Sequence, residues 1–329
     1  MDKYSRQIGA YGIEAMGKLV RLNVLIVGLK GVGIECAKNL TLAGPGGVTL
    51  LDDTPTEMRD LGSNFFLTEA DVGVPRAEVC APKLQELNPM VQVRAATGEL
   101  TEELVATHQC VVFTRGTRAE IERWNAFCRS QAAIAFLACD VKGVAGYIFS
   151  DFGPSFTIKD MNGENPLTRI ITHISNEEEG VVTLLGAFGE EGGRVHGLEE
   201  SDHDGWVSID DVEGMEAADG GSINTAEPMK IAFCTKPVFD PFRLKVGDTS
   251  RFSEYVNGGV LTQVKKPVAK AYRSFADNLR QPVGGSACCS PTARGFGRRK
   301  QLHFAFLALW EFEARHGAAP AGRRRRDPA

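Results

Sequence analysis

The first 150 residues alternate short apolar segments with segments whose apolar residues recur at helical spacing. The short apolar runs, at residues 24–27, 48–51, 91–93, 111–113 and 134–137, are expected to be strands. The segments 34–43, 76–87 and 120–129 are expected to be helices. Because parallel strands need long crossovers and helical crossovers cover both faces of the sheet, residues 1–154 predict a doubly wound, mostly parallel α/β domain of the Rossmann-like type.

The pattern changes after Phe152, where the chain becomes rich in glycine and acidic residues. Short β-prone runs at 180–185, 205–209 and 229–233 predict a small all-β insert over residues 155–250. Apolar residues at helical spacing return from Tyr255 and are clearest at Leu302, Phe306, Leu309, Trp310 and Phe312. We therefore expect the start of a helical bundle over 251–316, ended by Gly317, and a disordered basic tail over 317–329.

Charge is distributed unevenly, although the net charge of the 329 residues is only −5. Residues 160–219 contain 16 acidic and two basic residues, so this segment is strongly acidic. Such a surface repels nucleic acid and favours a basic protein partner, although a simple solvated face has the same composition.

Cysteines and histidines lack the spacing of a metal site. The eight cysteines form no CxxC pair, and His173, His196 and His203 show no ligand spacing, so no metal is expected. No leader and no membrane-spanning run are visible, and we expect a cytoplasmic and nuclear location with no membrane partner.

A glycine loop follows the first expected strand. The loop 28–33 (GLKGVG), which also contains Gly31, resembles the phosphate-binding pattern G-x-G-x-x-G. Gly28 and Gly33 take its first and last positions, but Lys30 stands at its middle position, where phosphate approaches bare backbone. Asp52 and Asp53 follow the second strand, where an acidic residue contacts ribose in nucleotide-binding proteins. The pattern favours a structural turn over a nucleotide site. A nicotinamide-dependent oxidoreductase therefore remains only a remote alternative.

Segments along nearly the whole chain resemble the N-terminal half of the eukaryotic ubiquitin-activating enzyme. In the first 153 residues the resemblance rests on 4–7 (YSRQ), 28–35 (GLKGVGIE), 37–40 (AKNL), 71–73 (DVG), 76–79 (RAEV), 86–88 (ELN), 139–143 (CDVKG) and 151–153 (DFG). Beyond them it rests on 162–167 (NGENPL), 180–183 (GVVT), 212–215 (VEGM), 258–260 (GGV), 263–265 (QVK) and 301–303 (QLH). The family continues well beyond these segments, so we expect a piece of a longer protein.

The resemblance implies an inactive copy of an adenylation fold, followed by the first catalytic-cysteine half-domain and part of a helical bundle. In the family's active copy, cationic side chains and an Asp hold MgATP, whereas Ser63, Val74 and the acid-free stretch 114–117 stand at the equivalent positions here. We expect no cofactor on this chain and MgATP only in the complete enzyme. Cys234 is expected to be structural, and Arg76, Arg115 and Arg118 to be ordinary solvated side chains.

Arg6 has a different expected role. The resemblance implies that this residue reaches the ATP phosphates of the active adenylation half, as an arginine finger supplied from a second domain, with Gln7 as a possible assistant. The implied partners are that active half, ubiquitin, and ubiquitin-conjugating enzymes reached through the complete enzyme. The alternative is a free-standing pseudo-enzyme subunit that pairs with a separate adenylating chain for another ubiquitin-like modifier.

Overall fold

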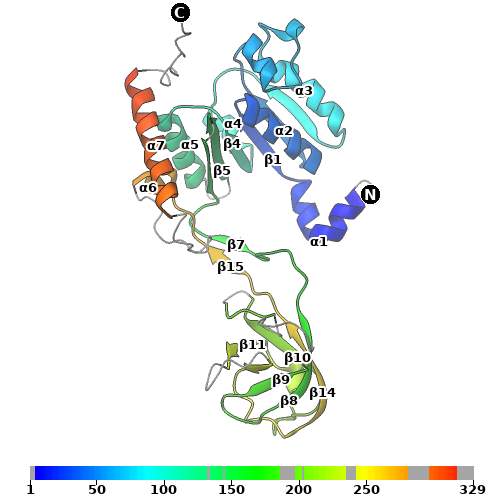
Figure 1. Cartoon of the computed structure of the whole chain (residues 1–329). Coiled ribbons are helices and arrows are strands. Elements are labelled where there is room, and N and C mark those ends of the chain that lie inside the picture. Colours follow the sequence, from blue (N-terminus) through cyan, green and yellow to red (C-terminus); the bar gives the residue numbers. More distant parts are fainter. Residues whose placement is uncertain are drawn as a thin grey trace, which may run out of the picture. The chain divides into compact units, whose positions relative to one another are not determined.

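The computed structural model describes residues 4–131, 134–143, 145–185, 197–201, 204–234, 242–280 and 296–316 (Figure 1). The chain divides into two compact units. Unit 1 comprises Met1–Phe156 and Ala271–Ala329, and unit 2 comprises Thr157–Lys270. The β-rich unit is thus inserted into the α/β unit, which the chain leaves and re-enters.

Unit 1 contains a six-stranded sheet in the order β3-β2-β1-β4-β5-β6. Its strands are β1 (Asn23–Val27), β2 (Gly47–Leu51), β3 (Gln92–Ala96), β4 (Cys110–Phe113), β5 (Ala135–Lys142) and β6 (Ala145–Asp151). β1 to β5 run parallel, and β6 runs antiparallel to β5. The strand order reverses between β1 and β4, and open α/β sheets bind ligands outside the carboxyl ends of the strands at such a reversal.

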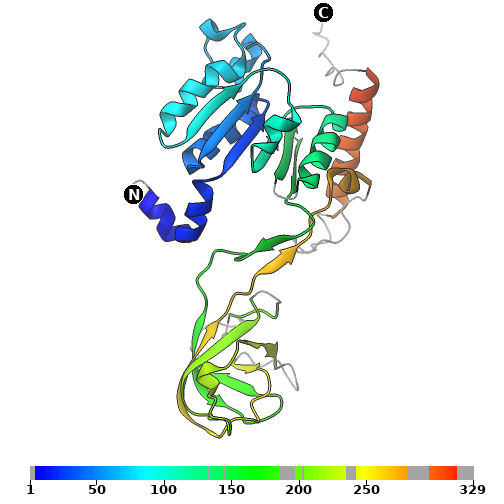
Figure 2. The ribbon, with the colours of Figure 1, turned by 180° about the vertical axis from the view of Figure 1, so that it is seen from behind.

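Helices cover both faces of this sheet (Figure 2). The helices of unit 1 are α1 (Ser5–Leu19), α2 (Gly31–Ala43), α3 (Arg76–Leu87), α4 (Glu102–Ala106), α5 (Arg118–Ser130), α6 (Phe275–Arg280) and α7 (Phe296–His316), with 3-10 turns η2 (Met58–Gly62) and η3 (Glu69–Asp71). Alternate residues of β1 face opposite cores. Val24 and Ile26 pack with α2 and α3, and Leu25 and Val27 pack with α4 to α7.

The expected fold class is confirmed, with differences at its edges. Each of the eight segments expected in the first 150 residues forms an element of the expected type. The sequence patterns do not predict α1, α4 or β6. No helix in the described part of the chain is long and apolar enough to cross a membrane.

Unit 2 is built on a seven-stranded antiparallel sheet in the order β11-β10-β14-β8-β9-β13-β12. Its elements are β8 (Thr168–Ile174), β9 (Val181–Leu184), β10 (Trp206–Gly214), η4 (Ile223–Thr225), β11 (Met229–Lys230), β12 (Ala232–Phe233), β13 (Arg243–Lys245) and β14 (Tyr255–Gln263). Only Ile231 separates the two outermost strands, so the sheet curls back on itself around a core that includes Ile171, Val207 and Leu261. A separate two-stranded sheet pairs β7 (Phe156–Ile158) with β15 (Val268–Lys270).

The expected start of the helical segment at residue 251 is wrong. Residues 255–263 form β14, and 268–270 form β15, so helix returns only at Phe275. The cause is visible in β14, where Gly259, Leu261 and Gln263 are buried and the residues between them are less buried, a strand period of two. Gly258 and Gly259, both at positive φ, obscure this period in the sequence.

The helical end of the chain packs on unit 1. Phe306 and Trp310 of α7 are buried with Phe275 of α6 and Tyr147 of β6. The expected tail, Gly317, Cys288, Cys289 and the side chain of Leu302 lie outside the described residues.

Candidate functional site

The glycine loop connects β1 to α2 at the carboxyl edge of the sheet. Gly28 has φ of 94°, and its N–H donates to the Leu51 carbonyl at 3.0 Å. A Cβ on Gly33 would lie 1.9 Å from the Gly28 carbonyl oxygen, so α2 approaches the loop at a distance that only glycine permits. These two glycines therefore perform the turn and packing roles of the phosphate-binding pattern.

Side chains of Arg115, Thr114 and Ser63 lie against two glycines of the loop. A Cβ on Gly28 would lie 2.9 Å from Arg115 Cγ and from Thr114 Oγ1, and the Thr114 hydroxyl donates to the Gly28 carbonyl at 2.7 Å. Ser63 lies against Gly31, where a Cβ would approach Ser63 Cβ to 3.3 Å. Lys30 begins α2 in an extended conformation and is exposed. Short neutral groups and an arginine stem thus border the space that phosphate needs.

Asp52 does not present a free carboxylate. It is 1% exposed and accepts hydrogen bonds from the backbone N–H of Leu29 at 2.8 Å and of Thr54 at 3.1 Å. Arg76 Nη1 lies 3.4 Å and Arg115 Nη1 3.3 Å from its Oδ1. The carboxylate that would bind ribose is therefore already bound within the protein.

Arg76 was expected to be a solvated surface residue, and this expectation is wrong. Its side chain is 1% exposed and lies between two buried carboxylates, Asp52 and Asp60, with Nη2 only 2.7 Å from Asp60 Oδ2. Burial alone would raise the pKa of Asp60, but the N–H donated by Glu57 and the Arg76 guanidinium outweigh it and lower the pKa below its ordinary value. No spacing in the sequence signals this cluster, because its members come from three separate elements.

The two other arginines are partly exposed, as expected for side chains near solvent. Arg115 is 42% exposed while it pairs with Asp52, and Arg118, 40% exposed, pairs with Glu122 one helical turn away. Asp53 is exposed, and its carboxylate accepts the backbone N–H of Gly98. Both aspartates that follow β2, Asp52 and Asp53, therefore have partners within the protein.

Arg6 lies at the opposite edge of the sheet from the glycine loop. It is exposed on the first turn of α1, next to Tyr4, which packs against Gly44 just before β2 begins. The loop lies instead at the carboxyl ends of β1 and β2, and a five-residue strand spans about 16 Å. The structure thus separates Arg6 from Gly28, Lys30, Gly31, Gly33 and Asp52.

Thiols in the described part of the chain are free and mostly buried. Cys234 is 9% exposed, which fits the structural role expected for it. A hydrogen bond from the Cys139 thiol lowers the pKa of Cys36 to about 7. Among the described residues no cluster of His, Cys, Asp and Glu could hold a metal ion, while His196 and His203 lie outside them.

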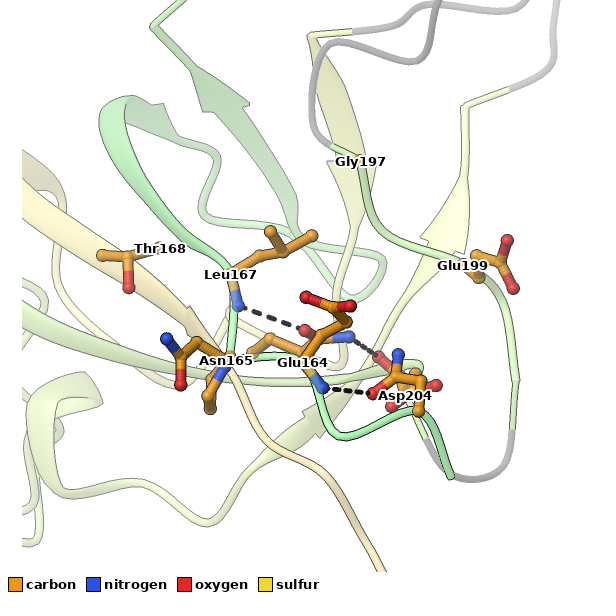
Figure 3. Close-up of a pocket in the computed structure, with 10 residues that line it drawn as sticks. Glu164, Asn165, Leu167, Thr168, Gly197, Glu199 and Asp204 are labelled. Carbon is orange, nitrogen blue, oxygen red and sulfur yellow. Dashed lines mark hydrogen bonds between the residues drawn. The ribbon is translucent and has the colours of Figure 1, made fainter. Parts of the chain in front are cut away.

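Unit 2 has a pocket with an acidic lining near one end of its sheet (Figure 3). Gln263 organises it, since its side chain accepts the Leu167 N–H and donates to the Asp204 carbonyl, each at 3.1 Å. Glu164 and Glu199 contribute carboxylates to the lining. Such a pocket suits a positively charged side chain of a partner.

Comparison with known families matches three consecutive parts of the chain. Residues 4–141 match the ThiF family, 177–265 the ubiquitin-activating enzyme E1 FCCH domain, and 266–328 the ubiquitin-activating enzyme E1 four-helix bundle. The first match lies within unit 1, and the second lies within unit 2.

Two ubiquitin-activating enzymes are similar to nearly the whole chain. Human ubiquitin-like modifier-activating enzyme 1 is 38% identical over 99% of this chain, which covers 28% of that relative. Wheat (Triticum aestivum) ubiquitin-activating enzyme E1 1 is 40% identical over 94% of this chain, which again covers 28% of the relative. Among solved structures, the E. coli tRNA N6-threonylcarbamoyladenosine dehydratase TcdA is 22% identical over 42% of this chain and 59% of its own, with a TM-score of 0.37. The chain spans little more than a quarter of the length of the first two relatives, and over nearly all of its own length it is similar to ubiquitin-activating enzymes of the E1 family.

Proposed function

We propose that this chain is the non-catalytic N-terminal part of a ubiquitin-activating enzyme. The whole enzyme would adenylate ubiquitin with MgATP, hold it as a cysteine thioester and pass it to conjugating enzymes, in the cytoplasm and nucleus. This chain would supply a scaffold, a surface that faces ubiquitin, and Arg6 for the ATP site of the active adenylation half.

The observation that carries the proposal is that the groups around the glycine loop already bind one another within the protein. Arg115 and Ser63 border the loop, and Asp52 is bound by Arg76, Arg115 and two backbone N–H groups. No acidic residue occupies 114–117 after β4, where a magnesium-binding carboxylate would be needed. The residues of this loop therefore do not fit MgATP, and the proposed role of the chain includes no adenylation step at this loop.

The position of Arg6 supports a role outside its own domain. The side chain is exposed at the amino edge of the sheet, away from the loop. An always-charged guanidinium that faces away from its own fold can reach phosphates held by a second one, which is how arginine fingers act.

The acidic lining of the unit 2 pocket supports a ubiquitin-facing surface. Glu164 and Glu199 lie where a basic side chain of a partner can enter. Opposite charges at an interface speed association and fix its orientation. Ubiquitin presents a basic face, so we assign the acidic surface of unit 2 to ubiquitin.

Calorimetric titration of the chain with MgATP tests the non-catalytic role. We expect no saturable binding, and micromolar affinity would contradict the proposal. Lys30→Ala, which changes the exposed residue at the start of α2, would then show whether the bound nucleotide occupies the loop. Lys38→Ala is the matched control, because Lys38 lies two turns further along α2 and pairs with Glu35 at 2.6 Å.

A further inference from the structure

Tyr4 packs against two residues of unit 1, Gly44 and Asn88. Its hydroxyl accepts a hydrogen bond from Asn88 Nδ2 at 3.1 Å. Its ring lies over Gly44, where a Cβ would come within 2.6 Å of the hydroxyl oxygen and 2.8 Å of Cε1. Gly44 also has φ of 89° as it ends α2, so glycine is required there both for the backbone and for the ring.

Hydrogen bonds to the rest of unit 1 hold the Asn88 side chain in place. Asn88 is 2% exposed and ends α3. Its Nδ2 also donates to the Thr41 carbonyl at 3.0 Å, while its Oδ1 accepts the Met90 N–H at 3.2 Å. Both amide hydrogens are therefore used, one within the domain and one on Tyr4.

The rest of α1 is mostly exposed. Met16 is its one buried residue, and Gly12, with φ of 80° and ψ of 160°, breaks the helix between Met16 and Arg6. Tyr11 and Ile13 on either side of this break are 69% and 76% exposed. The contacts of Tyr4 therefore contribute to the position of the first turn, which carries Arg6.

We propose that Tyr4, Gly44 and Asn88 form a latch that holds the α1 arm and positions Arg6 for its partner. The inference rests on the proposed function and deepens it. The latch joins two segments that lie far apart in the sequence, 4–7 and 86–88, since Tyr4 and Asn88 meet in the fold. Tyr4 and Asn88 are positioning residues, because they act through Arg6.

Hydrogen exchange measured by mass spectrometry on the whole chain tests the latch directly. Tyr4→Phe keeps the ring and removes the hydroxyl, which should speed exchange of the α1 amides about threefold to tenfold, the value of one hydrogen bond. Exchange in β1 should not change. Tyr11→Phe removes the same group from an exposed position of the same helix and should have no effect. Equal exchange in the two variants would overturn the latch.

ATP–pyrophosphate exchange with a separately expressed adenylating half tests whether the latch acts through Arg6. Tyr4→Phe should lower kcat/KM for ATP about threefold to tenfold, and Arg6→Ala should lower it further. In the double variant, Tyr4→Phe should add no loss to that of Arg6→Ala, because the positioned group is gone. Additive losses would overturn the positioning role. No effect of Arg6→Ala would instead overturn the proposed function, while hydrogen exchange would still decide whether the latch holds the arm.

Discussion

At the scale of single residues, the main finding is the buried ion cluster beneath the glycine loop. The sequence predicts a degenerate loop, because Lys30 stands where bare backbone is needed. It could not indicate that Arg76 joins Asp52 to Asp60, because the three residues come together only when β2, η2 and α3 pack. The cluster is thus a product of tertiary structure.

Arg76→Ala should destabilise the chain strongly. It leaves Asp60 buried without its cation and leaves Asp52 with the partly exposed Arg115 alone, and breaking a buried pair costs about 3–5 kcal/mol. The measurement is urea denaturation followed by circular dichroism. Arg118→Ala is the matched control, because its exposed pair with Glu122 contributes at most about 0.5 kcal/mol. Similar losses of unfolding free energy in the two variants would contradict the stabilising role of the buried Arg76.

Stability should also depend on pH through Asp60. Because the folded pKa of Asp60 is lowered, its carboxylate stabilises the fold above the unfolded pKa of about 3.9, and this stability is lost as pH falls through the folded value. Thermal unfolding scans from pH 7 to pH 3 should show a steeper fall of Tm below about pH 4 in the wild type than in Asp60→Asn. Parallel curves would show that Asp60 is not the group concerned.

At the scale of elements, the sequence predicted what depends on local periodicity. The parallel strands of unit 1 are short apolar runs, and their type was clear from the sequence. β14 was missed because two glycines interrupt its alternation, and its identity depends on pairing with β10 and β8. α1 was missed because its exposed surface and its break at Gly12 give no continuous apolar face.

Gly33→Ala should disturb the contact between α2 and β1. Its Cβ would overlap the Gly28 carbonyl oxygen at 1.9 Å, and overpacking of this kind costs about 1–3 kcal/mol or more. Thermal unfolding measures the loss. Gly62→Ala introduces the same methyl group where no atom lies within 4 Å, so it should leave the stability nearly unchanged. If Gly33→Ala also left the stability unchanged, the close approach of α2 to the Gly28 carbonyl would be refuted.

Trp310→Ala should weaken the packing of α7 against β6 and α6. The ring is 6% exposed and lies 5.1 Å from the Tyr147 ring and 5.7 Å from the Phe275 ring. Removing such a side chain costs about 3–5 kcal/mol. Phe312→Ala, on the same helix at a 38% exposed position, should cost much less. Urea denaturation of both variants compares them directly, and equal losses would contradict the packing.

At the scale of the whole molecule, the arrangement of the site could be predicted only in part. The family resemblance supplied both the loop and Arg6, but their placement at opposite edges of one sheet follows from the fold. This placement makes the central claim testable, because Arg6 cannot serve a nucleotide at its own glycine loop. We therefore propose that Arg6 acts on a second adenylation fold.

Ubiquitin-dependent ATP–pyrophosphate exchange tests this claim most directly. It is run on the chain alone, on the chain mixed with a separately expressed adenylating half, and on the same mixture with Arg6→Ala. Arg21→Ala is the control, since Arg21 is an exposed cation just beyond the other end of α1. We predict no exchange by the chain alone, exchange on mixing, and a loss with Arg6→Ala only. Exchange by the chain alone, or exchange on mixing that does not depend on Arg6, would contradict the account.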